Sequence, residues 1–411
     1  MIDLHMLREK SAVIVDLIRK KDPLFDVAAL LELDQSVRAK RSALEELRAQ
    51  KNDLARQARG GVTAAIREQS IALDAQIKSH EQMLHADEAA FKQLYLRCPN
   101  LPQDDVPVGN KESNRVVKEV GSKPAMAFQP KHHGELAGTS GWFDMHQAAI
   151  ITGSGFVLYK DQGVSVVYAL AMLMLKNNKK YGYRLMLPPD IVNYRSLEVA
   201  SNFPKFIDQA YAITQDELYL SPTAEVGLTN VYRDHIFNGE DLPIRMTAWT
   251  SCFRREAGGY GATERGLIRI HQFEKVELYT LCTPENSNQE HERMLACAED
   301  ILQQLGLHYR ISLLAGQDCS FASAKTYDIE VWLPGQKVYS EVSSVSNCTD
   351  FQSRRGAMRY KDDGSKTRLV HTLNGSSLAL PRLMVALMET YQQADGTIAL
   401  PDIITGSDFY L

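Results

Sequence analysis

An apolar pattern that repeats every seven residues, and runs without proline from about Val27 to Leu96, restricts most strongly what this chain can fold into. Apolar residues at this spacing are typical of helices that pack side by side as a coiled coil. The pattern is interrupted at Gly60-Gly61, and a glycine pair readily ends a helix. The sequence therefore predicts two antiparallel helices of about 30 residues each, or roughly 45 Å at 1.5 Å per residue. The apolar positions are Leu30, Leu33, Val37, Leu44, Leu47 and Leu54 before the glycines, and Ile66, Leu73, Ile77, Leu84, Phe91 and Leu94 after them, with Lys40 and Lys51 as polar exceptions.

The outer half of this predicted arm is basic. Between Ser36 and Glu68 there are eight Lys or Arg residues and four Asp or Glu residues, a local charge of +4, whereas the whole chain has a formal net charge of −5. A projecting basic element suits the phosphate backbone of a nucleic acid. An ordinary solvated helix face can carry the same charges, so charge alone leaves both interpretations open.

Prolines end the arm and begin a second region. The segment Cys98–Pro107 contains three prolines, which do not continue a helix. From there to Leu411 strand-like and helical segments alternate irregularly without a repeat, which predicts an antiparallel sheet packed with helices. We predict an α+β protein in which residues 1–105 form the arm, with the coiled coil at about 27–96, and residues 106–411 form the second domain.

Composition excludes several classes of protein. The longest uncharged run, Met145 to Tyr159, has 15 residues, whereas a membrane-spanning helix needs about 20. The N-terminus does not have the pattern of a secretory signal. The six cysteines are far apart in the sequence, which fits neither a disulfide framework nor a zinc site. We therefore expect a cytoplasmic protein without a membrane anchor.

The segment from Ala248 to Leu281 contains the strongest chemical signal, a glycine-rich middle between two strand-like flanks. Alternation predicts one charged face and one apolar face on the second flank, and places Arg254 and Glu256 together on the first. Unpaired charges are costly to bury, so the charged face is either a surface hairpin with ion pairs or a platform for a ligand. Arginine suits phosphate oxygens, an aromatic ring can stack a base, and a carboxylate can bind an ammonium group. The predicted charged face is Arg269, His271, Phe273, Lys275 and Glu277, and the apolar face is Ile268, Ile270, Val276 and Leu278.

The segments Phe253 to Gly258 and Gly266 to Glu277 resemble motif 2 of the class II aminoacyl-tRNA synthetases, and in detail that of the seryl-tRNA synthetases. The resemblance extends over essentially the whole chain. The arm resembles the tRNA-binding coiled coil of that family, and Leu220 to Val226 resembles its serine-binding segment. The resemblance implies an ATP-dependent ligase that activates L-serine as seryl-adenylate and transfers it to tRNA(Ser), and also to tRNA(Sec).

The same resemblance implies a role for individual residues. The implied catalytic residues are Arg254, Arg269 and Arg382. The implied ATP-binding residues are Arg254, Arg255, Glu256, Arg269, Ile270, Phe273, Glu341, Val342, Ser343, Ser344 and Arg382. The implied serine-binding residues are Thr223, Ala224, Glu225, Arg254, Glu277 and Ser376. The Pro334-Gly335 turn predicts that Tyr339 to Ser344 forms the return strand of a hairpin. Glu341 and Ser344 are the implied Mg²⁺ ligands, and because alternation puts them on opposite faces of this strand, a bulge or strand end is expected there.

Two further motifs complete the resemblance. Thr372 to Arg382 resembles motif 3, and we expect Pro381 in the first turn of the helix that follows, where its missing N–H is tolerated. Leu185 to Pro189 resembles motif 1, which implies a homodimer. The chain departs from the family pattern at Gly155, at Ala200 to Phe206 and at Gly261 to Arg265.

Three alternatives are considered. A prolyl- or threonyl-tRNA synthetase would have a further domain after motif 3, but only 29 residues follow Arg382. An enzyme that transfers an activated amino acid to a different acceptor, a carrier protein, would lack the arm. A non-catalytic RNA-binding paralogue would not need Arg254, Glu277, Glu341 and Arg382, which are all present.

Overall fold

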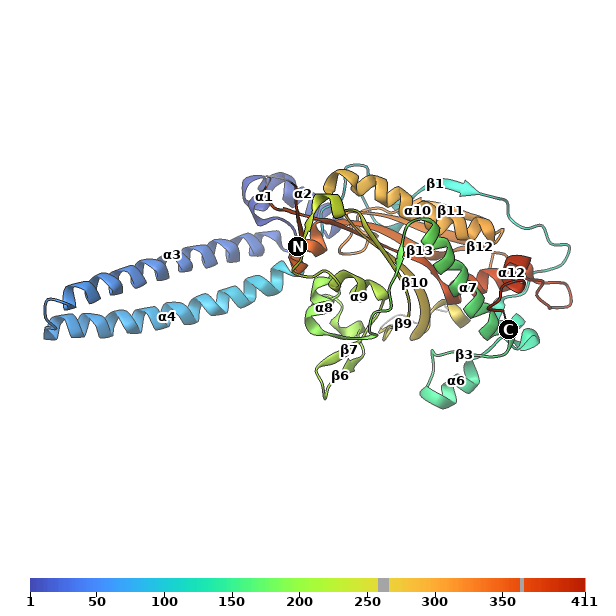
Figure 1. Ribbon diagram of the computed structural model, residues 1–411, viewed down its shortest axis with the longest axis horizontal. Helices are drawn as coiled ribbons and strands as arrows, with labels where there is room; N and C mark the ends of the chain where they lie inside the picture. Colours follow the sequence, from blue (N-terminus) through green and yellow to red (C-terminus); the bar gives the residue numbers. More distant parts are fainter. Residues whose placement is uncertain (258–265, 363–365, 411) are drawn as a thin grey trace. The chain divides into compact units, whose positions relative to one another are not determined.

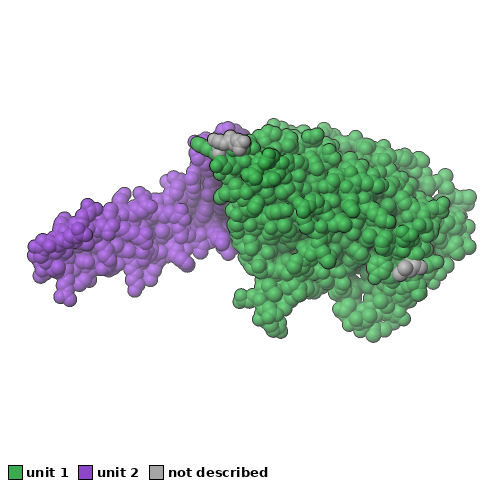
Figure 2. Space-filling model, viewed as in Figure 1, with its two compact units in different colours: residues 1–2, 99–411 green, residues 3–98 purple. Residues whose placement is uncertain are grey.

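A computed structural model describes residues 1–257, 266–362 and 366–410 of the chain. The segment Gly261 to Arg265, where the sequence departs from the family pattern, lies outside the described residues. The chain divides into two units, Asp3–Cys98 and Met1–Ile2 with Pro99–Leu411 (Figure 2).

The smaller unit is helical, and its two long helices confirm the prediction from the heptad. α3 (Val27–Ala58) and α4 (Ala64–Tyr95) follow two short helices, α1 (Leu4–Glu9) and α2 (Ser11–Lys21) (Figure 1). The side chains of Asp26 and Thr63 cap the long helices by accepting hydrogen bonds from backbone amides in the first turn. Gly61, in the turn between them, has a φ of +130°, which side chains rarely allow.

Apolar heptad residues form the seam between α3 and α4. Val37, Leu44 and Leu84 are buried there and pack against Ile77 and Phe91. The two polar exceptions take part in the same seam through ion pairs to α4, Lys40 with Asp87 and Lys51 with Asp74. The hydrogen bond from Lys40 holds the pKa of Asp87 below its usual range.

The arm is less basic than the predicted count implied, because the neutralising residues are on the returning helix. Arg41 on α3 pairs with Glu88 on α4 at 2.6 Å, and Arg48 pairs with Glu81 at 2.9 Å. These acidic residues lie outside the segment Ser36 to Glu68, whose local charge is +4. Arg59 and Arg67 lie beside the turn and form no ion pair among the described residues, so their positive charge is not neutralised in this way.

The larger unit is built on an eight-stranded sheet within the described residues, in the order β1-β11-β12-β13-β16-β10-β9-β4 (Figure 1). Its strand pairs are antiparallel except β4 with β9, which confirms the α+β class with an antiparallel sheet. Its strands are β1 (Arg115–Val120), β4 (Arg184–Leu185), β9 (Ile244–Phe253), β10 (Gln272–Cys282), β11 (Tyr309–Leu313), β12 (Lys325–Leu333), β13 (Val338–Thr349) and β16 (His371–Ala379). Short strands elsewhere are β2 (Phe143–Asp144), β3 (Leu158–Tyr159), β5 (Ile191–Asn193), β6 (Ala212–Ile213), β7 (Leu218–Leu220), β8 (Ile236–Asn238), β14 (Arg359–Lys361) and β15 (Arg368–Leu369).

Helices cover the sheet unequally and so leave room for a site. The main core joins the sheet to α7, α10 and α12, and includes Val276 and Leu278 of β10. On the other face of β10, Tyr279 and Leu281 are covered by α9, while the odd residues closer to the start of the strand are not part of a core cluster. The helices of this unit are α5 (His133–Ser140), α6 (Met145–Thr152), α7 (Gln162–Lys180), α8 (Tyr194–Val199), α9 (Ala224–Asn230), α10 (Ser287–Gln304), α11 (Phe351–Gly356), α12 (Leu380–Tyr391) and α13 (Asp402–Thr405).

The strands around motif 2 are shorter than the alternation predicted. β9 ends at Phe253, and Glu256 has a φ of +49°, so Arg254 and Glu256 do not share a strand face. A single 3₁₀ turn, Gly266–Ile268, precedes β10, which begins only at Gln272. Arg269, Ile270 and His271 therefore precede the strand, and the predicted alternation holds from Phe273 onward.

Among the residues that the structure describes, no helix has the length and apolar character needed to cross a membrane.

The arm seam yields a stability prediction. Leu44→Ala removes a buried side chain from the seam, and we expect it to lower the free energy of opening α3 and α4 by about 2–3 kcal/mol. Hydrogen exchange of the backbone amides in α3 and α4, followed by mass spectrometry, measures this. Glu46→Ala, an exposed position in the same helical turn, is the control, and equal exchange rates in the two variants would contradict the seam.

Candidate active site

A cavity of about 670 Å³ opens on the part of this β10 face that no core cluster covers. It is lined by residues that follow β9, by the first half of β10, by the first turns of α9 and α12, and by parts of β13 and β16. Predicted site residues that line it are Thr223, Glu225, Arg254, Glu256, Arg269, Ile270, Phe273, Glu277, Glu341, Val342, Ser344, Ser376 and Arg382.

Three predicted residues do not line the cavity. Arg255 is exposed, and its guanidinium donates a hydrogen bond to the carbonyl of Asp208. Ala224 belongs to the hydrophobic core beneath α9. Ser343 is buried behind the wall, where its hydroxyl donates to the carbonyl of Ser376 at 2.6 Å. Ser343 therefore fixes the position of Ser376 and does not itself face the cavity.

One end of the cavity contains a buried ion pair. Glu277 and Lys275, two residues apart on β10, are 2% and 7% exposed and pair with each other. Thr223 joins them, because its hydroxyl donates to the Glu277 carboxylate at 2.7 Å and accepts from Lys275 Nζ at 2.8 Å. Thr223 is also the N-cap of α9, so the end of this helix is fixed to the charged pair.

A second carboxyl group lies at the same end. Burial, and after it the negative charge of Glu277, raises the pKa of Glu225 to about 7. Its Oε1 accepts hydrogen bonds from Gln352 at 2.6 Å and from Asn374 at 3.1 Å. This end of the cavity can therefore bind a cationic group between two carboxyl groups, while the threonine hydroxyl holds the site in place.

The middle of the cavity combines a cation with an aromatic ring. The Arg254 guanidinium carbon lies 5.2 Å from the centre of the Phe273 ring. The Arg254 backbone amide donates to the His271 carbonyl at 2.8 Å, and His271 Nδ1 lies 3.0 Å from the Arg254 carbonyl oxygen. Two hydrogen bonds to the same neighbour thus fix the arginine backbone, which agrees with a structural role for His271.

The other end of the cavity contains two more arginines. Arg269 Nε pairs with Glu256 at 2.6 Å. Arg382, in the first turn of α12, donates from Nη1 to the Glu341 carbonyl at 2.9 Å and from Nε to the Ile268 carbonyl at 3.3 Å. Pro381 occupies the second position of α12, as predicted, because the helix begins at Leu380. Fixed guanidinium groups at this end suit a polyphosphate.

A bulge in β13 brings together the two predicted metal ligands. Ser343 pairs with Ile329 of β12, and Glu341 pairs with the next residue, Glu330, so Val342 is the extra residue. The β12–β13 hairpin and the expected bulge are both confirmed, and Glu341 and Ser344 line the same cavity.

Asp328 of β12 stands opposite Ser344 and was missed by the sequence analysis. Burial, and then the charge of Glu341, raises the pKa of Asp328 well above its usual range. Its Oδ1 is buried without a hydrogen-bond partner among the described residues. An orphaned carboxylate oxygen beside Glu341 and a hydroxyl is a hard donor set that fits Mg²⁺. Counting back from the Pro334-Gly335 turn across the bulge would have located it.

Lys275 and Asn374 are two polar residues that line the cavity and were not among the predicted site residues. The alternation did place Lys275 on the correct face, but a lysine beside a predicted ammonium site was not expected to pair with the carboxylate there. Asn374 comes from β16, and nothing in the sequence places this strand beside β10.

Two of the departures from the family pattern lie near the site. Asn202, Phe203 and Phe206, in the segment Ala200 to Phe206, form part of the cavity wall. Gly155 accepts a hydrogen bond from the His271 amide at 2.8 Å through its carbonyl. This bond uses only backbone atoms.

Comparisons with known proteins agree with this geometry. Residues 209–391 match the family model of the tRNA synthetase class II core domain (G, H, P, S and T). A prolyl-tRNA synthetase from Giardia lamblia shares the fold, with a TM-score of 0.59 at 15% identity over 66% of this chain and 54% of the other. Fold and cavity together define a class II aminoacyl-tRNA synthetase.

The arm and the full-length relatives define the class more narrowly. Residues 1–102 match the seryl-tRNA synthetase N-terminal domain. A serine–tRNA ligase from Chlamydia abortus is 43% identical over 98% of this chain and 97% of its own length. The crystal structure of seryl-tRNA synthetase from Pyrococcus horikoshii complexed with ATP has a TM-score of 0.91 at 30% identity, over 99% of this chain and 98% of the other. The chain belongs to the seryl-tRNA synthetase family.

The raised pKa of Glu225 predicts a pH dependence of stability. From the ordinary value of 4.5 up to about 7, the folded chain holds a proton that the unfolded chain has released. The free energy of unfolding of the wild type should therefore fall as the pH rises, relative to Glu225→Gln, by at most about 1.4 kcal/mol per pH unit. Urea unfolding at a series of pH values measures this difference.

The exposed residue Glu240 provides the control for that experiment. The free energy of unfolding of Glu240→Gln should change with pH in parallel with that of the wild type over the same pH range. A constant difference between the wild type and Glu225→Gln from pH 4.5 to 7 would contradict the raised pKa.

Proposed function

We propose that this protein ligates L-serine to tRNA(Ser) in two steps that use one cavity and ATP. The arrangement of the cavity carries the proposal: arginines at one end, two carboxyl groups with a threonine hydroxyl at the other, and Phe273 with Arg254 between them. This is the order of groups in an amino acid placed against the α-phosphate of ATP.

In the first step a serine carboxylate oxygen attacks the α-phosphorus of ATP. The bond from that phosphorus to the bridging oxygen breaks, and pyrophosphate leaves with the electron pair. Arg254 neutralises charge at the α-phosphate and the serine carboxylate, while Arg269 and Arg382 hold the outer phosphates. Alignment and charge stabilisation are enough for this step, so it needs no protein nucleophile.

The purine and the amino acid are held in separate parts of the cavity. Phe273 stacks on the adenine, with Glu256 and the backbone of Ile270 at its edge. Glu277 and Glu225 bind the serine ammonium, and Thr223 and Ser376 surround its side chain. A pocket closed by these side chains favours a small hydroxylated amino acid.

Glu341 and Ser344, with Asp328 beside them, would hold Mg²⁺. The ion supplies positive charge to the phosphates when it is bound. The orphaned oxygen of Asp328 supports this donor set.

In the second step a hydroxyl of the terminal adenosine of tRNA attacks the carbonyl carbon of seryl-adenylate, and AMP leaves. The arm supplies the tRNA contact, with tRNA(Ser) as the acceptor and tRNA(Sec) as a second one. Arg59 and Arg67, beside the turn of the arm, have no ion-pair partner in the described part of the chain and suit a phosphate backbone.

We also propose that the protein acts as a homodimer. β4 forms one edge of the sheet, and the segment around it exposes Leu185 and Leu187, which are 51% and 89% accessible. Exposed apolar side chains next to an open sheet edge suit pairing with a second copy.

Amino-acid-dependent exchange of pyrophosphate into ATP tests the first step. Across a panel of amino acids, serine should give the fastest exchange. Arg254→Ala should lower kcat/KM by at least about 100-fold, because it removes charge from the reacting phosphate. Arg255 is the next residue, and its side chain lies outside the cavity, so Arg255→Ala should change kcat/KM by less than about threefold. Faster exchange with threonine or alanine, or equal losses in the two variants, would refute the proposal.

Shortening the arm tests the second step. Leu44 and Leu84 pack together in the seam, so replacing residues 44–84 by Gly-Gly shortens both helices at one level. Pyrophosphate exchange should continue at the wild-type rate, and serine transfer to tRNA should fall by at least about 100-fold, because the backbone contacts are lost. Loss of both activities, or of neither, would contradict this division of roles.

A further inference from the structure

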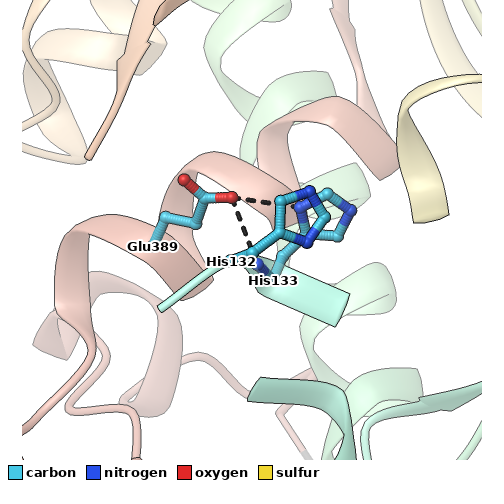
Figure 3. A group of neighbouring side chains, drawn as sticks. All are labelled: His132, His133 and Glu389. Atoms are coloured by element: carbon cyan, nitrogen blue, oxygen red, sulfur yellow. Dashed lines mark hydrogen bonds and ion pairs between the residues drawn. The ribbon is translucent and has the colours of Figure 1, made fainter. Parts of the chain in front are cut away.

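Glu389 on α12 is a buried carboxylate, away from the cavity lining, that binds two other segments of the chain. Figure 3 shows its contacts with His133. Its Oε1 accepts from the His133 backbone amide at 3.2 Å, from His133 Nδ1 at 3.0 Å and from Gln336 Nε2 at 2.9 Å. Its Oε2 accepts from the Gly335 amide at 2.9 Å. One side chain thus joins α12 to the start of α5 and to the turn of the β12–β13 hairpin.

His132, His133 and Glu389 lie close enough together to suggest a metal site, since one ligand atom from each is within 4.8 Å of the others. The hydrogen bonds argue against a metal. Glu389 already accepts four hydrogen bonds, three at Oε1 and one at Oε2, so protein donors surround both of its oxygens. His132 Nδ1 accepts from the Gly134 amide at 3.0 Å and serves as the N-cap of α5.

The remaining nitrogen of His133 faces motif 2. His133 Nδ1 lies against Glu389, and Nε2 is buried without a hydrogen-bond partner among the described residues. A Cβ added to Gly266 would lie 2.2 Å from it. The imidazole therefore packs directly against the backbone of Gly266, the first described residue after the motif 2 loop, where φ is +75°.

We propose that His133, held by Glu389, is a positioning residue that fixes Gly266–Arg269 and thereby places Arg269 for the outer phosphates of ATP. The proposal rests on the function proposed above and assigns a role to a residue outside the cavity. Helix α12, which carries Glu389, also contacts the segment Gly266–Arg269 directly, because Arg382 donates to the Ile268 carbonyl at 3.3 Å. The segment is thus located by α12 at two points, one through His133 and one through a phosphate-binding arginine.

The network also reaches the predicted metal ligands. Glu389 binds the Gly335-Gln336 turn, and β13 runs from that turn to Glu341. Three residues would meet the β- and γ-phosphates, namely Arg269, Arg382 and Glu341. The elements that carry them are therefore all linked through the carboxylate of Glu389. The serine-binding side chains come from α9, β10 and the middle of β16, which make no direct hydrogen bond to Glu389 among the described residues.

The test compares two nucleotides on the full-length protein. His133→Ala should weaken ATP binding about tenfold, because the outer phosphates lose an aligned arginine, and should leave AMP binding unchanged. Equilibrium dialysis measures both affinities. In pyrophosphate exchange the KM for ATP should rise by a similar factor, while the KM for serine stays within about twofold. His133→Asn, whose amide can replace Nδ1 as the donor to Glu389, should recover part of the ATP affinity.

His132→Ala is the matched control and should leave both nucleotide affinities unchanged. Equal weakening of ATP and AMP, or no weakening in His133→Ala, would overturn the proposal. Parallel losses in the two histidine variants that added Zn²⁺ restores would establish a metal site instead. Circular dichroism checks folding, and Glu389→Gln replaces His133→Ala if that variant unfolds. If the wild type shows no serine-dependent exchange, the proposed function fails, whereas the ATP and AMP comparison still decides the role of His133.

Discussion

Charged side chains on the buried face of a central strand are the constraint on which the rest of the structure depends. Lys275 and Glu277 are almost inaccessible, and a buried charge is strongly unfavourable unless it is paired and hydrogen-bonded. The pair meets this requirement internally, with Thr223 as the third member. Because Thr223 is also the N-cap of α9, the helix that covers the rest of this strand face is located by the charged pair. The site and the fold are therefore specified by the same contacts.

The two units differ in how far their contacts extend along the chain. In the arm, α3 and α4 follow each other through a short turn, and the heptad pattern alone predicts both helices and their seam. The cavity, in contrast, combines α9, β10, β13 and α12, which are separated by tens of residues. A local pattern can predict which face of β10 is charged, but it contains no information about which distant segment lies opposite.

This difference explains what the sequence could and could not predict. The hairpin at Pro334-Gly335, the bulge before Ser344 and the position of Pro381 follow from local rules, and all three are confirmed. The predicted extents of β9 and β10 were wrong. Glu256, which has a positive φ, breaks the predicted alternation after β9, and a 3₁₀ turn replaces it before β10. The charge of the arm was overestimated because its acidic partners lie one helix later. The network around Glu389 has no local signal, since its donors are more than 50 residues away in the sequence.

Under the proposed function, the carboxyl groups of the cavity also explain how a buried site can accept the ammonium group of an amino acid. Glu277 is neutralised by Lys275, and Glu225 has a pKa raised to about 7, so near neutral pH this end of the empty cavity has little net charge. A serine ammonium placed between the two carboxyl groups favours the ionised form of Glu225. Binding of the substrate would then release a proton, and the ammonium would become the partner of a carboxylate that is otherwise too costly to ionise. A neutral analogue that has the hydroxyl but not the ammonium supplies no such charge. Under the proposed function, selectivity for an amino acid therefore follows from the same burial that shifts the pKa of Glu225.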